Sequence, residues 1–165
     1  MKRVIFPGTF DPPTLGHLDI IKKAACIFDH VYVAIGNNIS KSQTAFSLDA
    51  RLQLLKTITK TIPNVEIVTF QGLLIDFAKQ LDVQIILKAV RNATDIDYEN
   101  LQAQINRQMG GIETLFMFSE EKFRLISSTL VKEIAKYNKR LNAFVPSEIE
   151  ETVFKHLFKQ FNKDD

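Results

Sequence analysis

The chain has 165 residues and a mass of 18.9 kDa, enough for one domain with an ordinary core and too few for two, so we expect a single domain spanning residues 1–165. Its 45% hydrophobic and 24% charged residues exclude a disordered chain, and a net charge of +2 does not indicate a nucleic-acid partner. With no run of about 18 apolar residues, no leader-like N-terminus and one cysteine, Cys26, we expect a cytoplasmic protein without a membrane partner or a disulfide framework.

Short runs rich in β-branched residues alternate along the chain with segments of helical spacing. We expect strands at residues 3–6, 31–35, 65–70, 84–87 and 114–118. We expect helices between the earlier strands at residues 15–28, 48–58 and 74–81. This alternation predicts an α/β fold, a doubly wound, five-stranded parallel sheet of the Rossmann-like type with helices on both faces.

The C-terminal part of the chain has helical patterns only. The stretch Ser127-Ser128-Thr129 stands before an amphipathic turn as a helix cap, and Ser147 with Glu150 has the spacing of a capping box. In the last helix, apolar residues recur at helical spacing and predict docking on the core, with a subunit contact as the alternative: Ile149, Val153, Leu157 and Phe161.

The stretch GTFDPPTLGH, residues 8–17, follows the first strand, and Thr14 is placed to cap the first helix. In open parallel sheets, ligands bind at the carboxyl ends of the strands, where this loop would lie. A helix N-terminus attracts anions, and Gly8 and Gly16 let the backbone approach a ligand. The helix dipole opposes protonation of His17, which predicts a neutral imidazole that donates one hydrogen bond to a phosphate.

Loops rich in cations or hydrogen-bond donors follow three further strands, at residues 36–42, 88–91 and 119–129. In a parallel sheet they open on the same edge as His17, which favours phosphate chemistry by positioning and charge neutralisation. Taken singly, such a histidine, lysine or arginine is more often a surface residue, so the combination carries the prediction. No group of side chains has the spacing of a metal site.

Residues 8–17 resemble the GTFDPxTxGH loop of the nucleotidyltransferase superfamily, and ISSTLVKEI, residues 126–134, is similar to its second hallmark. Further segments follow in the order of bacterial-type phosphopantetheine adenylyltransferases: FDHVYVAIG, FSLDAR, FQGLLIDFAK, VRNATDIDYE and INRQM. The resemblance covers essentially the whole chain. It implies adenylyl transfer from ATP to 4'-phosphopantetheine in coenzyme A biosynthesis, giving dephospho-coenzyme A and pyrophosphate. It also implies a homohexamer, and Mg²⁺ held mainly by the ATP phosphates.

The same resemblance implies roles for individual residues. The implied catalytic residues are His17, Thr9 and Lys41. His17 would stabilise the α-phosphate of ATP, and Thr9 and Lys41 would orient the attacking phosphate. The implied acceptor-binding residues are Thr9, Lys41, Leu74 and Lys88. The implied ATP-binding residues are Thr9, Phe10, His17, Ala89, Val90, Arg91, Glu99, Phe123, Arg124, Leu125, Ile126, Ser127, Ser128 and Thr129.

The chain departs from the family pattern after the fourth strand, where Lys88 and Ala89 replace the usual arginine and glycine. Lysine keeps the charge but lacks the two-pronged fork, so we expect weaker phosphate binding. A methyl group on Ala89 costs energy if the backbone there has a positive φ. Two alternatives stay open: a sister enzyme using nicotinamide mononucleotide, or glycerol 3-phosphate with CTP, and a nucleotide-binding regulator without catalysis.

Overall fold

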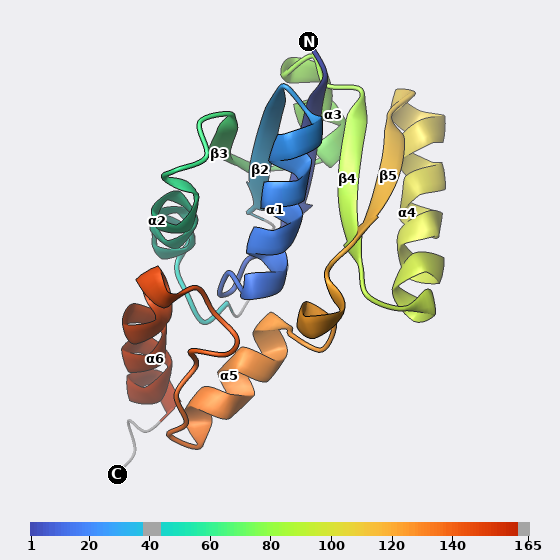
Figure 1. Cartoon of the computed structure of the whole chain (residues 1–165). Coiled ribbons are helices and arrows are strands. Elements are labelled where there is room, and N and C mark those ends of the chain that lie inside the picture. The colour runs from blue at the N-terminus through green and yellow to red at the C-terminus, as the bar shows by residue number, and fades with distance from the viewer. Residues whose placement is uncertain (38–43, 162–165) are drawn as a thin grey trace.

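The computed structural model describes residues 1–37 and 44–161 (Figure 1). Strands and helices alternate from the N-terminus: β1 (Arg3–Gly8), α1 (Leu15–Ile27), β2 (His30–Gly36), α2 (Leu48–Thr59), β3 (Val65–Phe70), α3 (Leu74–Gln80), β4 (Ile85–Val90), α4 (Ala93–Gly110) and β5 (Glu113–Phe118). A short 3-10 helix η1 (Glu121–Phe123) and the helices α5 (Ser128–Lys136) and α6 (Ser147–Phe161) follow. Each predicted strand and helix is present, although the end predicted for the fourth strand is wrong, and the α/β class with C-terminal helices is confirmed.

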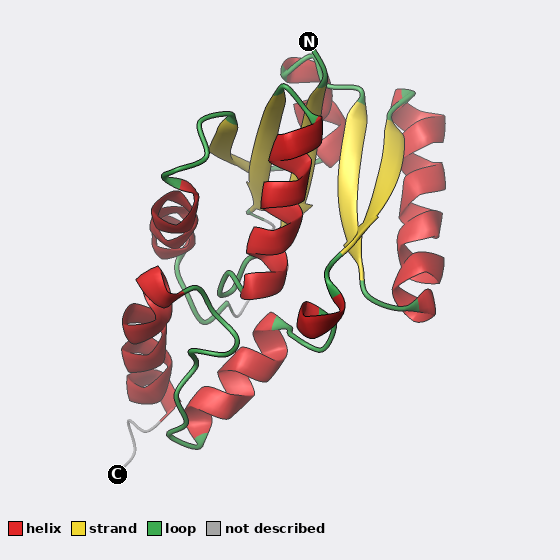
Figure 2. Ribbon diagram, in the orientation of Figure 1, coloured by secondary structure: helices red, strands yellow, loops and turns green. Residues whose placement is uncertain are grey.

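The five strands form one parallel sheet in the order β3-β2-β1-β4-β5 (Figure 2). The chain builds outward from β1 to β3, then crosses back to place β4 on the other side of β1. The strand order therefore reverses between β1 and β4, and ligands of doubly wound sheets bind at the carboxyl end of that point. In Figure 1 this edge of the sheet faces η1 and α5.

Both faces of the sheet are buried, each in its own hydrophobic cluster. On β1, Val4 and Phe6 join a cluster with α1, α2, α5 and α6, while Ile5 between them joins a second cluster with α3. This alternation follows from the two-residue period of a strand. Coverage of both faces confirms the predicted doubly wound arrangement.

The strands β1 and β4 separate toward their carboxyl ends. β1 pairs with β2 from Arg3 to Gly8 but with β4 only at Ile5, opposite Ile86. Pro7 has no N–H and so cannot donate to the ladder. The separation opens the sheet at the point where a ligand is expected.

Strand β4 runs further than the sequence predicts. Lys88, Ala89 and Val90 lie within β4 and pair with Phe116, Met117 and Phe118 of β5, so the prediction that they form a loop is wrong. The pairing with β5 supplies hydrogen bonds that local sequence does not reveal. Ala89 is not among the residues with positive φ, so its methyl group causes no strain of that kind.

The C-terminal helices confirm one predicted cap and contradict the other. The Ser127 side chain accepts the Leu130 N–H at the start of α5. The capping box of α6 is wrong, because Glu150 is buried and accepts instead from the Leu141 N–H and from Arg140. These partners, from the loop that precedes α6, replace the local cap because a buried carboxylate needs strong donors.

The predicted apolar stripe of α6 docks on the core through Ile149, Val153 and Leu157, all of which are buried. Phe161 is partly exposed at the end of the helix, where the Lys136 ammonium lies 4.6 Å from its ring centroid. Within residues 1–37 and 44–161, no helix is long and apolar enough to cross a membrane.

Candidate functional site

The loop between β1 and α1 is fixed by the buried carboxylate of Asp11, which is 4% exposed. Asp11 accepts the backbone N–H groups of Ala45 at 2.9 Å and Phe46 at 2.8 Å, and the Lys132 ammonium of α5 at 3.1 Å. A buried charge is stable only when paired and hydrogen-bonded, as this one is. One side chain thus joins three segments that are far apart in the sequence.

Phe10 forms the floor of the same loop. It has a left-handed backbone, with φ 51°, and its buried ring meets the His17 ring edge-on at a centroid distance of 4.9 Å. A Cβ on Gly8 would lie 2.8 Å from Phe10 Cζ, closer than real contacts allow. Gly8 is therefore required for the ring to sit beneath the site.

His17 is held as a neutral ring at the first turn of α1. The His17 ring atom Nδ1 accepts a hydrogen bond from the backbone N–H of Thr14 at 3.0 Å. The backbone N–H of His17 donates to the Thr14 hydroxyl at 3.4 Å, which confirms Thr14 as the predicted cap. Because Nδ1 accepts, the ring hydrogen is on Nε2. Burial, and secondarily the charge of Arg91, lowers the pKa of His17 from 6.5 to about 4. The side chain is thus a neutral donor at pH 7.

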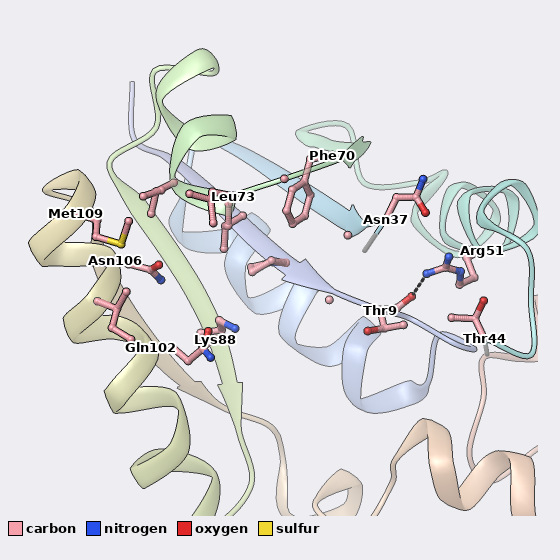
Figure 3. Close-up of a pocket in the computed structure, with 17 residues that line it drawn as sticks. Thr9, Asn37, Thr44, Arg51, Phe70, Leu73, Lys88, Gln102, Asn106 and Met109 are labelled. Carbon is pink, nitrogen blue, oxygen red and sulfur yellow. Dashed lines mark hydrogen bonds between the residues drawn. The ribbon is translucent and has the colours of Figure 1, made fainter. Parts of the chain in front are cut away.

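A first cavity, of about 450 Å³, lies between the carboxyl end of β1 and the helices α3 and α4, and we call it the α3–α4 cavity. Its walls are mixed, with an apolar part formed by Phe70, Leu73, Leu74, Ile105 and Met109 and a polar part formed by Thr9, Asn37, Thr44, Arg51, Lys88, Gln102 and Asn106. Figure 3 shows Leu73 and Met109 toward one end of it and Thr9, Thr44 and Arg51 toward the other. The cavity suits a ligand with an extended, weakly polar arm and a polar end.

A second cavity, of about 280 Å³, lies at the start of α1 and α5, and we call it the α1–α5 cavity. The N-termini of both helices face it through His17 and Ser128, and Arg91 adds a positive charge. Helix N-termini and a cation favour an anionic ligand. Phe10 and Phe123 supply aromatic surface in the same cavity.

The two cavities share one wall, formed by Pro7, Gly8 and Lys88. Lys88 Nζ lies 2.9 Å from Glu99 Oε2 on α4, and both side chains are mostly buried. This wall stands where β1 and β4 part. Two ligands, one in each cavity, would meet over Gly8 beside Lys88.

The structure brings most of the predicted residues to these cavities. The α3–α4 cavity is lined by Thr9, Leu74 and Lys88 of the implied acceptor set. The α1–α5 cavity is lined by Phe10, His17, Lys88, Ala89, Arg91, Glu99, Phe123, Ile126, Ser127 and Ser128. Lys41 lies outside the described residues.

Five predicted nucleotide residues do not line the α1–α5 cavity, and one of them, Thr9, lines the α3–α4 cavity instead. Val90 is fully buried in the sheet, and Leu125 is 84% exposed. Arg124 donates to the Arg91 carbonyl at 3.0 Å, and Thr129 lines a separate hollow beside α6. In this structure Arg124 acts on the site through Arg91.

Several polar groups of the site already have protein partners. Arg91 forms an ion pair with Asp95, with Nε 3.0 Å from Oδ2, and the Ser128 hydroxyl donates to the Pro12 carbonyl at 2.8 Å. The Ser127 hydroxyl accepts the Leu130 N–H as the cap of α5. These contacts hold the side chains in place at the rim of the α1–α5 cavity.

Sequence reasoning missed Arg51, which is 4% exposed and lines the α3–α4 cavity. Its Nη1 donates to the Thr9 carbonyl at 2.9 Å, and its Nε has no hydrogen-bond partner among the described residues. Burial lowers the pKa of this guanidinium, and the nearby Asp11 partly offsets that effect. The segment FSLDAR, which contains Arg51, supports the resemblance to the family. The residues next to Arg51 in the sequence do not indicate that it contacts Thr9.

Comparisons with known proteins give a consistent family. Residues 5–134 match the model of the cytidylyltransferase-like family. A phosphopantetheine adenylyltransferase of Thermobifida fusca is 44% identical over 151 residues, 92% of each chain. That of Caldanaerobacter subterraneus is 42% identical over 164 residues, 99% of each chain. A solved structure assigned as a nicotinate-nucleotide adenylyltransferase of Vibrio parahaemolyticus shares the fold, with a TM-score of 0.65 at 17% identity, covering 98% of this chain and 94% of that one.

The depressed pKa of His17 predicts a specific titration. The ring should stay neutral as the pH falls and take up a proton with a midpoint of about 4, because protonation breaks the Thr14 bond and buries a charge near Arg91. The unfolded chain binds that proton below about 6.5, so this group removes stability as the pH falls from about 6.5 to about 4. Heteronuclear NMR of the ring nitrogens measures the midpoint directly. A midpoint near 6.5 would contradict the buried, neutral ring.

Proposed function

We propose that this chain, which belongs to the phosphopantetheine adenylyltransferase family of cytidylyltransferase-like proteins, transfers the adenylyl group of ATP to 4'-phosphopantetheine. The products are dephospho-coenzyme A and pyrophosphate, in the route to coenzyme A. The observation that carries the proposal is the pair of cavities that share the wall of Pro7, Gly8 and Lys88. A two-substrate transfer needs such a junction.

The chemistry of each cavity supports one substrate. ATP suits the α1–α5 cavity, where two helix N-termini and Arg91 face its phosphates and Phe123 offers a surface for the base. The pantetheine arm suits the α3–α4 cavity, where Leu74 and Met109 are apolar and Asn106 can pair with an amide. Its phosphate then lies toward Lys88, beside the ATP.

The reaction is an in-line displacement at the α-phosphorus of ATP. A phosphate oxygen of the acceptor forms the new P–O bond, and the bond to the leaving pyrophosphate breaks. The acceptor phosphate is already anionic near neutral pH, so no general base is needed. Positioning of the two phosphates can supply about 7–11 kcal/mol in favourable systems.

His17 and Lys88 are the residues of the chain that we propose stabilise the phosphates in that step. The neutral His17 ring offers its Nε2–H to an α-phosphate oxygen as charge builds there, with no change of protonation state. Lys88 places a positive charge at the shared wall, where both phosphates meet. Thr9 and Lys41 are proposed to orient the acceptor phosphate, and Thr9 lines the α3–α4 cavity.

We propose Mg²⁺ as the cofactor, bound mainly through the ATP phosphates. The donor set fits this mode, because Glu99 of the α1–α5 cavity is paired with Lys88 and Asp95 with Arg91. Across residues 1–37 and 44–161, no three metal-ligating side chains gather. The ion would neutralise phosphate charge while bound to the nucleotide.

We also propose a homohexamer in the cytoplasm. Large apolar side chains are exposed along one edge of the molecule, on α4, on β5 and in the loop that follows η1: Leu101, Leu115, Phe118 and Leu125. Exposed apolar surface of this kind marks interaction sites. Sedimentation velocity measures the mass of the assembly, and a monomer at micromolar concentration would refute the hexamer.

A product assay tests the proposed function. With Mg-ATP, we expect pyrophosphate release and a product of the mass of dephospho-coenzyme A only when 4'-phosphopantetheine is the acceptor. Nicotinamide mononucleotide with ATP, and glycerol 3-phosphate with CTP, serve as rival pairs. His17→Ala serves as the control, with a loss of about 100-fold or more in turnover.

Two results of that assay would contradict the proposal. Turnover with a rival pair alone would make the chain a sister enzyme. Nucleotide binding without turnover on any acceptor would make it a regulator.

Lys88 gives a second prediction. Lys88→Arg should lower KM for 4'-phosphopantetheine about two- to fivefold, because a guanidinium can keep Glu99 and also bind phosphate through two N–H groups. Steady-state kinetics measures the change, with Lys79→Arg on the exposed surface of α3 as the matched control. An unchanged KM would show that the lysine costs nothing in phosphate binding.

A further inference from the structure

We propose that His156, on the last helix, is a positioning residue for the α3–α4 cavity. It holds the backbone of residues 44–46 against the site, and its removal should weaken binding of the phosphate acceptor selectively. The identity of that acceptor rests on the proposed function. The contacts that carry the inference do not.

His156 reaches the segment through two contacts. Its Nε2 lies 2.7 Å from the Ala45 carbonyl oxygen, and its ring stacks on Phe46 with centroids 4.2 Å apart and planes at 28°. A carbonyl oxygen can only accept, so the His156 Nε2 donates in this bond. The stacked Phe46 ring is 2% exposed, which places the contact at the edge of the core.

The opposite side of the segment is held by the loop of the site itself. The N–H groups of Ala45 and Phe46 donate to Asp11, while the Ala45 carbonyl accepts from His156. The peptide backbone is thus clamped between β1's loop and α6.

The segment lines only one of the two cavities of the site, and its other side lines the hollow beside α6 that contains Thr129. Thr44 lines the α3–α4 cavity, where Figure 3 shows it close to Thr9 and Arg51, and it is not among the residues of the α1–α5 cavity. A looser segment therefore changes the wall seen by the acceptor, and leaves the nucleotide wall as it is. This asymmetry separates a positioning role from a general role in stability.

His156 can be replaced without undocking α6. Its own side chain is exposed, and the helix is anchored by Ile149, Val153 and Leu157, which are fully buried on another face. Three variants separate the hydrogen bond to Ala45 from the stacking on Phe46. His156→Phe keeps an aromatic ring for stacking but has no donor, His156→Gln keeps a donor without the ring, and His156→Ala lacks both.

Kinetics is the first test. KM for 4'-phosphopantetheine should rise about two- to tenfold in His156→Phe and His156→Ala, the range expected for one lost hydrogen bond. KM for ATP should stay within about twofold, since that cavity does not contain the segment. His156→Gln should recover most of the loss. Lys155→Ala, an exposed change on the same helix, is the control and should match the unmodified chain.

Amide hydrogen exchange is the second test, and it does not depend on activity. The Ala45 and Phe46 amides should exchange faster in His156→Phe than in the unmodified chain or Lys155→Ala. Unchanged exchange rates of these amides in His156→Phe would overturn the inference. An equal rise of the two KM values, or no rise in either of them, would also overturn it. If the unmodified chain makes no dephospho-coenzyme A, the proposed function fails, and the exchange rates alone decide for or against the clamp.

Discussion

The site depends on the buried carboxylate of Asp11. Its oxygens satisfy two backbone N–H groups and the Lys132 ammonium, and so tie the loop after β1 to residues 44–46 and to α5. A carboxylate without these partners would be too costly to bury, and the partners would lose their acceptor. One desolvated charge therefore holds the loop that carries His17 and the wall that carries Thr44.

The separation of β1 from β4 turns this fixed loop into a junction. Pairing between the two strands stops after Ile5, and Pro7 cannot extend it. Gly8 keeps the backbone open over the Phe10 ring, and Lys88 reaches the same place from β4. The geometry offers room for two phosphates and a neutral histidine beside them, which is what a transfer by positioning requires.

The parts of this structure that local sequence determines could be predicted. The alternation of strands and helices, the Thr14 cap and the Ser127 cap each depend on residues close in sequence. Local sequence did not predict the extension of β4 or the place of Arg51, because β5 and Thr9, which set them, are distant in the sequence. It did not predict the role of Glu150 either, because its partners Leu141 and Arg140 lie outside the helix, in the loop before it.

The resemblance brought most of the site together where residue patterns alone suggested only a phosphate-binding edge. It also implies nucleotide contacts for Val90, which is buried in the sheet, and for Leu125, which is 84% exposed in the single chain. The central claim is that one molecule of product spans both cavities, and a crystal structure with dephospho-coenzyme A tests it most directly. We expect the adenosine in the α1–α5 cavity, the diphosphate over Gly8, and the pantetheine arm along Leu74. A product confined to one cavity, or bound in the reverse direction, would contradict the claim.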